Sequence, residues 1–221
     1  MQVTVVAGVG RGPTELSAYD AALAAAAVHN YNLVSVSSVV PATATVEVRE
    51  TAPNLGPAGH RLTVVAAETV AQPTDVRDLD VTAEPVTTDT GDMSTDAGDE
   101  STRTTHVESG CNNVDTHVVA SLGWATGSGP GLFYEATGTD PVAVRKRVRR
   151  GLDAGSDLRE WDLPTRDTLT AVATPEPDAY VGAVAVAAFG TAEPVDGVGG
   201  PDRTESSTRR RGTRLEPDTF A

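Results

Sequence analysis

The run from Val34 to Pro41 constrains the fold of this chain more than any other segment. It reads Val-Ser-Val-Ser-Ser-Val-Val-Pro, so valines typical of a buried strand flank a serine pair on both sides. Buried hydroxyl groups cost free energy unless they are hydrogen-bonded, and the neighbouring residues supply no evident partner. The proline stops the strand and turns the chain. We therefore expect one strand over residues 31–40 that ends in two serines at a turn.

The pair Ser37–Ser38 in this setting permits self-cleavage of the chain. The Ser38 hydroxyl can attack the Ser37 carbonyl and move the acyl group from nitrogen to oxygen. β-Elimination from the resulting ester leaves a dehydroalanine, which hydrolyses to a pyruvoyl group at the new N-terminus. Such a step requires a strained or twisted peptide and a donor to the developing oxyanion. The alternative is a polar strand end whose hydroxyls bond to the backbone.

The composition indicates one acidic domain. A chain of 221 residues can bury one sizeable core. It has 17 basic and 31 acidic residues, a net charge of −14, and Lys146 is its only lysine. This balance is typical of a protein from a high-salt cytoplasm, where a dense carboxylate surface maintains hydration, although an ordinary acidic mesophilic protein is the alternative. The same acidity argues against nucleic acid as a partner.

Other function classes find little support in the sequence. No stretch has the apolar length of a transmembrane helix, and the N-terminus lacks the basic region of a signal peptide, so a cytoplasmic protein without membrane contact is expected. The single Cys111 allows no intrachain disulfide and no cysteine-based metal cluster. The four histidines are scattered without metal-ligand spacing. We therefore expect no metal site.

The remaining pattern predicts a layered α+β or α/β domain over residues 1–190. A short strand over residues 2–7 is expected to lead into a turn-rich loop from Gly8 to Pro13. Thr14 and Asp140 are expected to cap helices over residues 16–28 and 142–154. Further strands are expected over residues 44–49, 60–67, 117–123, 130–136, 168–174 and 180–190.

Two segments lack this pattern. Residues 68–115 contain twelve acidic and two basic residues, which is −10 of the net −14, and show almost no aliphatic periodicity. Such a segment cannot bury enough apolar surface to offset its ordering entropy, so we expect a largely disordered acidic insertion. Residues 191–221, with Gly-Gly-Pro and Arg-Arg-Arg runs, are expected to form a disordered tail.

Four stretches, taken in order along the chain, resemble the pyruvoyl-dependent arginine decarboxylase family. They are VAGVGRGPTELSAYDAAL, HNYNLVSVSSVVP, GLFYEATG and YVGAVAVAAFG. A serine pair alone is a weak signal. Here Ser38 follows Asn32 by six residues and Asp20 by eighteen, downstream of GVGxGxTEL, and this combination is far more specific. The resemblance implies an αββα sandwich that assembles as a homotrimer of processed two-chain protomers, with active sites between subunits.

The resemblance also implies an activity, the conversion of L-arginine to agmatine and carbon dioxide at the entry to polyamine synthesis. Decarboxylation leaves a carbanion, so an electron sink is needed, and a pyruvoyl group can supply it. The sequence shows no convincing phosphate cradle with a well-placed lysine, which disfavours pyridoxal phosphate. In this reading Ser38 is the pyruvoyl precursor, and Ser37 becomes the C-terminus of the short chain.

Three further residues receive roles from the resemblance. Glu135 follows an apolar strand, where desolvation favours a neutral carboxyl group, and it would protonate the α-carbon. Asn32 would donate its amide to the Ser37 carbonyl oxygen during cleavage, and Asp20 would bind the substrate guanidinium from across the subunit interface. The structural alternatives are a solvated glutamate, an Asx turn and a helix-surface aspartate.

Two other functions remain open. A pyruvoyl-dependent decarboxylase could act on another amino acid, with histidine the first to consider, although Asp20 favours a cationic side chain. A relative of the same fold that never processes could serve as a non-catalytic assembly subunit. The presence of Asn32, Ser37, Ser38 and Glu135 together argues against that second possibility, because a scaffold does not need all four.

Overall fold

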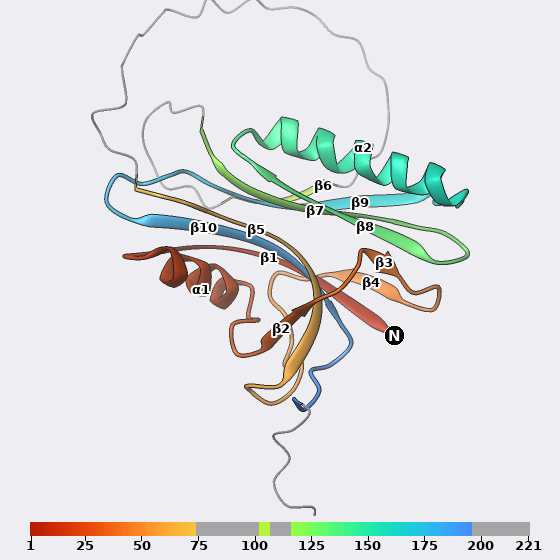
Figure 1. Ribbon diagram of the computed structural model, residues 1–221, viewed down its shortest axis with the longest axis horizontal. Helices are drawn as coiled ribbons and strands as arrows, with labels where there is room; N and C mark the ends of the chain where they lie inside the picture. The colour runs from red at the N-terminus through yellow and green to blue at the C-terminus, as the bar shows by residue number, and fades with distance from the viewer. Residues whose placement is uncertain (74–101, 107–115, 196–221) are drawn as a thin grey trace, which may run out of the picture.

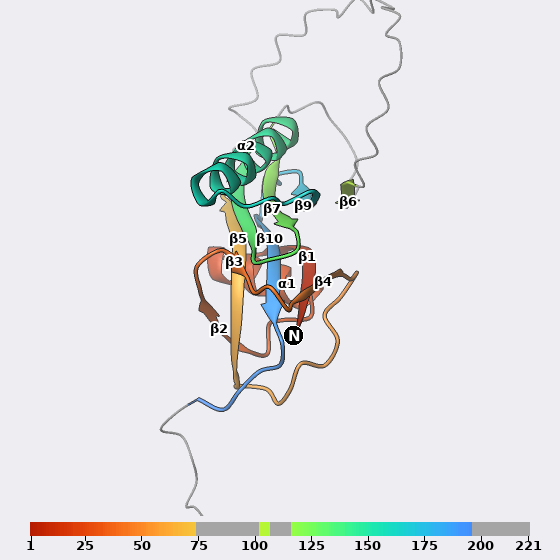
Figure 2. The same cartoon turned by 90° about the vertical axis from the view of Figure 1, so that its right-hand side faces the viewer.

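The computed structural model describes residues 1–73, 102–106 and 116–195, with residues 102–106 described by their backbone alone. Two five-stranded sheets face each other, and one helix covers the outer face of each (Figures 1 and 2). The order of layers is helix, sheet, sheet, helix. The predicted αββα sandwich is therefore confirmed.

The first sheet, sheet A, has the strand order β2-β5-β10-β1-β4, and the second, sheet B, has the order β3-β8-β7-β9-β6. In each sheet the central strands pair antiparallel, whereas β2, β4 and β6 add in parallel at an edge. The elements are β1 (Gln2–Gly12), α1 (Glu15–Ala25), β2 (Asn32–Ser35), β3 (Val39–Val40), β4 (Thr45–Val48), β5 (Arg61–Ala71), β6 (Thr102–His106), β7 (Val118–Thr126), β8 (Gly131–Gly138), α2 (Pro141–Arg159), β9 (Thr165–Ala173) and β10 (Tyr180–Phe189).

Side chains alternate across each sheet and so build three apolar layers. Val5 of β1 and Leu122 of β7 lie in the layer between the sheets. Val6, the next residue of β1, faces α1 in the second layer. On sheet B, Val148 and Leu152 of α2 pack onto the third layer. All five side chains are at most 2% exposed, so each of the three layers is closed to solvent.

The glycines after residue 7 extend β1 and do not form the expected loop. Gly8, Gly10 and Gly12 alternate on the strand face that contacts α1, and a Cβ built on any of them would lie within 2.3 Å of an α1 atom. The absence of these side chains lets the alanine-rich helix approach the sheet closely. The expectation of a turn-rich loop from Gly8 to Pro13 was therefore wrong, because a period-2 glycine pattern was interpreted as turn chemistry.

Both predicted helix starts are confirmed. Thr14 and Ser17 form a reciprocal capping box at the start of α1, where the Ser17 N–H donates to the Thr14 hydroxyl at 3.2 Å. Asp140 accepts a hydrogen bond from the Val142 N–H at 2.8 Å, with Pro141 in the first turn of α2. α2 continues to Arg159, five residues beyond the expected end. Neither helix in the described part of the chain is long and apolar enough to span a membrane.

Other boundaries differ from those expected. β5 continues to Ala71, so a start of the acidic insertion at residue 68 is too early. Within that segment the backbone of residues 102–106 forms β6, while residues 74–101 and 107–115 lie outside the described residues. Glu193, at the start of the expected tail, bridges to Arg61 through its backbone and through an ion pair of 2.9 Å. The rest of the tail, from residue 196, also lies outside the described residues.

Replacing Gly8 by alanine tests the close packing of α1 on sheet A. A Cβ at this position would lie 2.1 Å from the Ala22 carbonyl oxygen, which is backbone and cannot swing aside. We expect Gly8→Ala to lower the free energy of unfolding by about 2–3 kcal/mol, as overpacking does. Gly129→Ala is the matched control, because its Cβ would have no atom within 4 Å. Equal stability of the two variants in denaturant unfolding would contradict this account.

Candidate active site

The segment with the serine pair crosses from one sheet to the other. β2 ends at Ser35, and the Val36 N–H still bonds to the Val64 carbonyl of sheet A at 3.0 Å. Three residues later, Val39 pairs with Leu132 of β8 in sheet B. The single strand expected over residues 31–40 is therefore two short strands, one in each sheet, and the serines lie between them (Figure 1).

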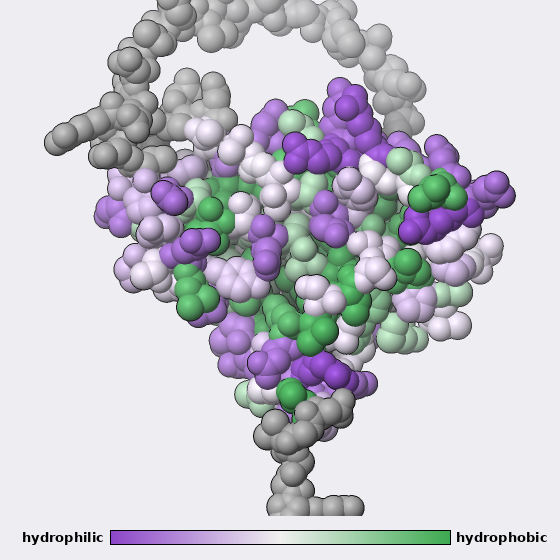
Figure 3. Space-filling model, in the orientation of Figure 1, coloured by the Kyte–Doolittle hydropathy of each residue, from purple (hydrophilic) through white to green (hydrophobic). Residues whose placement is uncertain are grey.

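Three of the four valines around the pair are exposed in the single chain, contrary to our expectation, and only Val40 is buried. Val34, Val36 and Val39 are 40%, 43% and 36% exposed. The crossing segment runs along the outside of the sandwich, so its side chains have no second layer above them. The face seen in Figure 3 shows hydrophobic residues at its middle, where this segment passes, and hydrophilic residues along the α2 edge.

Backbone hydrogen bonds fix the turn at the serine pair. The Val39 N–H donates to the Ser37 carbonyl oxygen at 2.8 Å, which closes a three-residue turn centred on Ser38. The Phe133 N–H of β8 donates to the Ser38 carbonyl oxygen at 2.9 Å. The Ser37 carbonyl therefore already has a donor at its oxygen. Sequence reasoning missed this donor, because a backbone N–H carries no residue-type signal.

Glu135 contacts the Ser38 side chain. The Ser38 hydroxyl lies 3.0 Å from Oε2 and 3.3 Å from Oε1 of Glu135, so it donates to this carboxylate. Two residues 97 positions apart are thus brought together by the pairing of β3 with β8. Glu135 lies within β8, not at its end, and is exposed in the single chain.

A pocket of about 480 Å³ opens beside this contact. One wall consists of Ser38 and residues 132–135, and the other is the C-terminal half of α2. The ring of Tyr134 lies directly against the α2 backbone at Gly151, where a Cβ would be 2.2 Å from the ring. Gly151, Gly155 and Arg159 repeat every four residues, so they form one stripe along α2 that faces the pocket.

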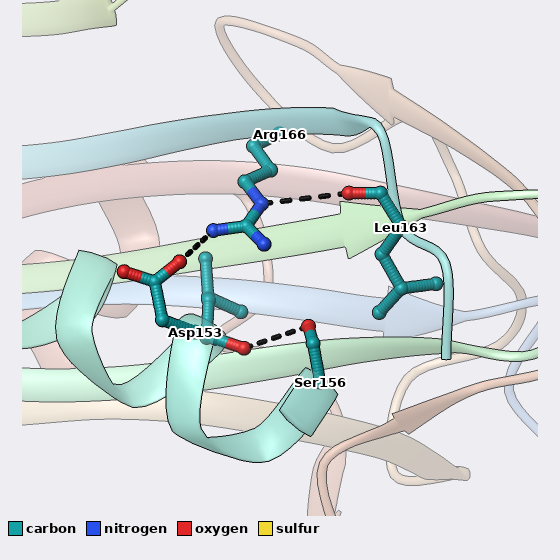
Figure 4. Close-up of polar contacts among 5 residues, drawn as sticks. Asp153, Ser156, Leu163 and Arg166 are labelled. Carbon is teal, nitrogen blue, oxygen red and sulfur yellow. Dashed lines mark hydrogen bonds and ion pairs between the residues drawn. The ribbon is translucent and has the colours of Figure 1, made fainter. Parts of the chain in front are cut away.

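Polar contacts on the other side of α2 fix the position of that stripe (Figure 4). Arg166, in β9, pairs with Asp153 of α2 and also donates from Nε to the Leu163 carbonyl oxygen at 3.4 Å. The buried Ser156 hydroxyl donates to the Leu152 carbonyl oxygen at 2.8 Å. The Arg166–Asp153 pair ties α2 to β9 of sheet B, whereas the Ser156 hydrogen bond lies within α2.

Asn32 does not contact Ser37 in this structure. Its side-chain amide donates to the Gly59 carbonyl, and its backbone N–H donates to the His60 carbonyl at 2.8 Å. β2 is extended from Asn32 to Ser35, so Asn32 precedes Ser37 by more than about 10 Å at the usual strand rise. The processing role of Asn32 therefore stays a prediction.

Asp20 lies far from the serine pair within one chain. It is exposed on α1, which covers the outer face of sheet A (Figure 1), whereas residues of β8 and α2 on sheet B line the pocket. Its neighbour Tyr19 donates a hydrogen bond to Glu68 at 2.7 Å. Burial and the Glu68 carboxylate raise the pKa of the Tyr19 phenol, so this hydroxyl remains a donor. The substrate role of Asp20 also stays a prediction.

The residues at the turn fit a pyruvoyl group made from the chain itself. The Ser38 hydroxyl donates to the Glu135 carboxylate, and the Ser38 carbonyl accepts a hydrogen bond from a backbone N–H of β8. The preceding carbonyl, that of Ser37, accepts from the Val39 N–H. It also lines an open pocket, so a group formed at this position is accessible to a small substrate. Among the predicted site residues, the structure brings Ser37, Ser38 and Glu135 together and leaves Asn32 and Asp20 apart.

Comparison with known proteins gives a consistent result. The model of the pyruvoyl-dependent arginine decarboxylase family matches residues 2–98 and 81–194. The pyruvoyl-dependent arginine decarboxylases of two strains of Halobacterium salinarum, R1 and NRC-1, are each 40% identical to this chain over 196 residues, covering 88% of this chain and 97% of the relative. The Ser38 hydroxyl donates to Glu135 at the crossing between the sheets, as described above. Because of this sequence similarity, the chain belongs to the pyruvoyl-dependent arginine decarboxylase family.

Proposed function

We propose that this protein cleaves itself between Ser37 and Ser38 and then converts L-arginine to agmatine and carbon dioxide. The observation that carries the proposal is the hydrogen bond from the Ser38 hydroxyl to Glu135 inside an open pocket. The matching family and the two relatives are both named as pyruvoyl-dependent arginine decarboxylases, which supports the same reaction for this chain.

The contacts at the turn support the cleavage chemistry. The Ser38 hydroxyl attacks the Ser37 carbonyl carbon, the C–N bond breaks, and an ester forms with the nitrogen left as the new N-terminus. The Val39 N–H, already 2.8 Å from the Ser37 carbonyl oxygen, is positioned to stabilise negative charge there. Elimination then breaks the ester C–O bond at the Ser38 β-carbon and frees Ser37 as a carboxylate. Water hydrolyses the dehydroalanine to the pyruvoyl group and releases ammonia.

In the decarboxylation, the chain's own residues position the substrate and move a proton. The pyruvoyl group supplies the electron sink for the carbanion left by carbon dioxide. Glu135 would hold the proton that the α-carbon receives, and its contact with Ser38 supports this role. Tyr134, stacked against Gly151, forms the wall that confines the substrate beside Glu135.

Intact mass under denaturing conditions tests the cleavage. We expect two chains, residues 1–37 and residues 38–221, and the longer one should have the mass of a pyruvoyl terminus. Ser38→Ala lacks the nucleophile and should remain one chain. The protein is incubated both in molar KCl and in low salt, because its acidic composition predicts that it folds and processes best in high salt. A single uncleaved wild-type chain in both conditions would favour the non-catalytic assembly subunit.

Glu135→Gln separates cleavage from turnover. The glutamine amide oxygen can still accept the Ser38 hydrogen bond, so we expect the chain to process. It cannot donate a carboxylic proton, so kcat should fall by about 10²–10⁴-fold, as loss of a general acid does. Carbon dioxide release from arginine measures kcat, and denaturing mass measures processing. A processed variant with the wild-type kcat would remove Glu135 from the reaction. Histidine, tested in the same assay, examines the alternative substrate.

We further propose that the active site is shared between subunits of a trimer. Asp20 lies on α1 over the outer face of sheet A, whereas the pocket beside Ser38 is walled by α2 on sheet B, so an Asp20 that binds the substrate guanidinium is proposed to belong to a neighbouring copy. The exposed valines at the crossing give that neighbour an apolar surface on which to pack.

Subunit complementation tests the shared site. Asp20→Ala and Ser38→Ala should each abolish most activity when produced alone. Co-expression in equal amounts should restore activity, because random mixing completes about a quarter of the interfaces of a cyclic oligomer. Each complete interface would combine the pyruvoyl group of one subunit with Asp20 of the other. If the mixture stays as inactive as its components, each site lies within one subunit.

The acidic composition supports a high-salt cytoplasm as the working environment. A net charge of −14 produces repulsion that salt screens, and both relatives come from a Halobacterium. We place the reaction at the entry to polyamine synthesis, because agmatine is a diamine precursor.

A further inference from the structure

Arg159 gives the pocket a positive charge, and the proposed reaction assigns no role to this residue. Among the described residues that line the pocket, it is the only cationic side chain. Leu132, Phe133 and Leu158 line the same pocket and are apolar. Charged groups interact more strongly beside apolar surface than in open water, so an anion that enters would be attracted to Arg159.

Two contacts hold the Arg159 guanidinium in place. Its Nη1 donates to the Gly155 carbonyl oxygen one turn earlier at 3.1 Å. Its Cζ lies 5.5 Å from the centroid of the Trp161 ring, within the range of a cation–π contact. The guanidinium is therefore oriented before any ligand arrives, which lowers the entropy cost of binding.

The end of α2 brings Trp161 under the guanidinium. Glu160 adopts the left-handed conformation, with φ of 53°, and the Trp161 N–H returns to the Ser156 carbonyl oxygen at 3.1 Å. This is a Schellman ending, which is usually built with glycine. The helix terminus thus places a cation and the ring that supports it at the same edge of the pocket.

Arg159 also lacks an acidic partner. Arg61 pairs with Glu193 and Arg166 pairs with Asp153, but no carboxylate in the described ranges pairs with Arg159. Its remaining N–H groups have no acceptor among the described residues. A fixed guanidinium with free donors presents the geometry that binds a carboxylate through two parallel hydrogen bonds.

We propose that Arg159 binds the α-carboxylate of the substrate amino acid. The inference rests on the proposed function, in which the substrate amine reaches the group formed at Ser38 and the α-carbon lies near Glu135. The α-carboxylate is one bond from that carbon, so it occupies the same pocket as Arg159. Decarboxylation removes this group. Arg159 therefore favours arginine over agmatine and promotes exchange of product for substrate.

A second anion arises near the pocket, the Ser37 carboxylate released by cleavage. Ser38 lines the pocket, whereas Ser37 does not, and the Ser37 carbonyl is already bonded to the Val39 N–H. The structure therefore favours the substrate carboxylate as the partner of Arg159. The rate of self-cleavage distinguishes the two anions, because only the Ser37 carboxylate takes part in processing.

The experiment compares Arg159→Met and Arg159→Lys with Arg150→Met. Arg150 is exposed on α2 and does not line the pocket, so it controls for loss of a helix cation. Processed proteins are assayed for kcat and KM with L-arginine and for competitive inhibition by agmatine, which lacks the carboxylate. Denaturing mass follows the rate of cleavage.

We expect Arg159→Met to process normally and to raise KM for arginine by about 10–100-fold, the usual cost of losing a charged hydrogen-bonding partner. Its inhibition constant for agmatine should be unchanged, Arg159→Lys should be intermediate, and Arg150→Met should match wild type. Unchanged KM, an equal loss for arginine and agmatine, or slowed cleavage with normal KM would overturn the inference alone. A wild-type protein that does not decarboxylate arginine would overturn the proposed function and the inference with it.

Discussion

The passage of one short segment between two sheets is the constraint on which the site depends. Val36 is bonded to sheet A and Val39 to sheet B, so the two residues between them span a fixed gap. The gap is fixed because apolar side chains fill the space between the sheets. Ser37 and Ser38 therefore cannot relax into a longer strand, and the turn at Ser38 persists as long as the sandwich does.

The same packing explains why residues distant in sequence meet at this turn. β3 adds to β8 at the edge of sheet B, and that pairing sets Glu135 against Ser38. α2 then packs on β8, is tied to β9 by the Arg166–Asp153 pair, and closes the other side of the pocket. The site is assembled from sheet edge, turn and helix terminus, so each part of its geometry follows from the fold.

The sequence predicted the parts of this arrangement that depend on local pattern. Capping at Thr14 and Asp140 and the long Val/Ala strand β10 follow from short-range chemistry, and all three appear as expected. The glycines of β1 were misinterpreted because their role is to admit α1, a tertiary contact that local sequence does not encode. The break between β2 and β3 was missed for the same reason. Val34 to Val40 has strand propensity throughout, and only the position of a second sheet divides it. Arg159 was overlooked because its importance comes from its place at a pocket wall.

The crossing has a mechanical consequence for the cleavage that we propose between Ser37 and Ser38. β1 and β2 would remain in sheet A through main-chain pairing with β4, β5 and β10, so the short chain would stay embedded. The two new ends would then be attached to different sheets, Ser37 after β2 of sheet A and Ser38 before β3 of sheet B. The topology would thus keep both chains in one fold after the cut, because each new end is anchored by its own sheet.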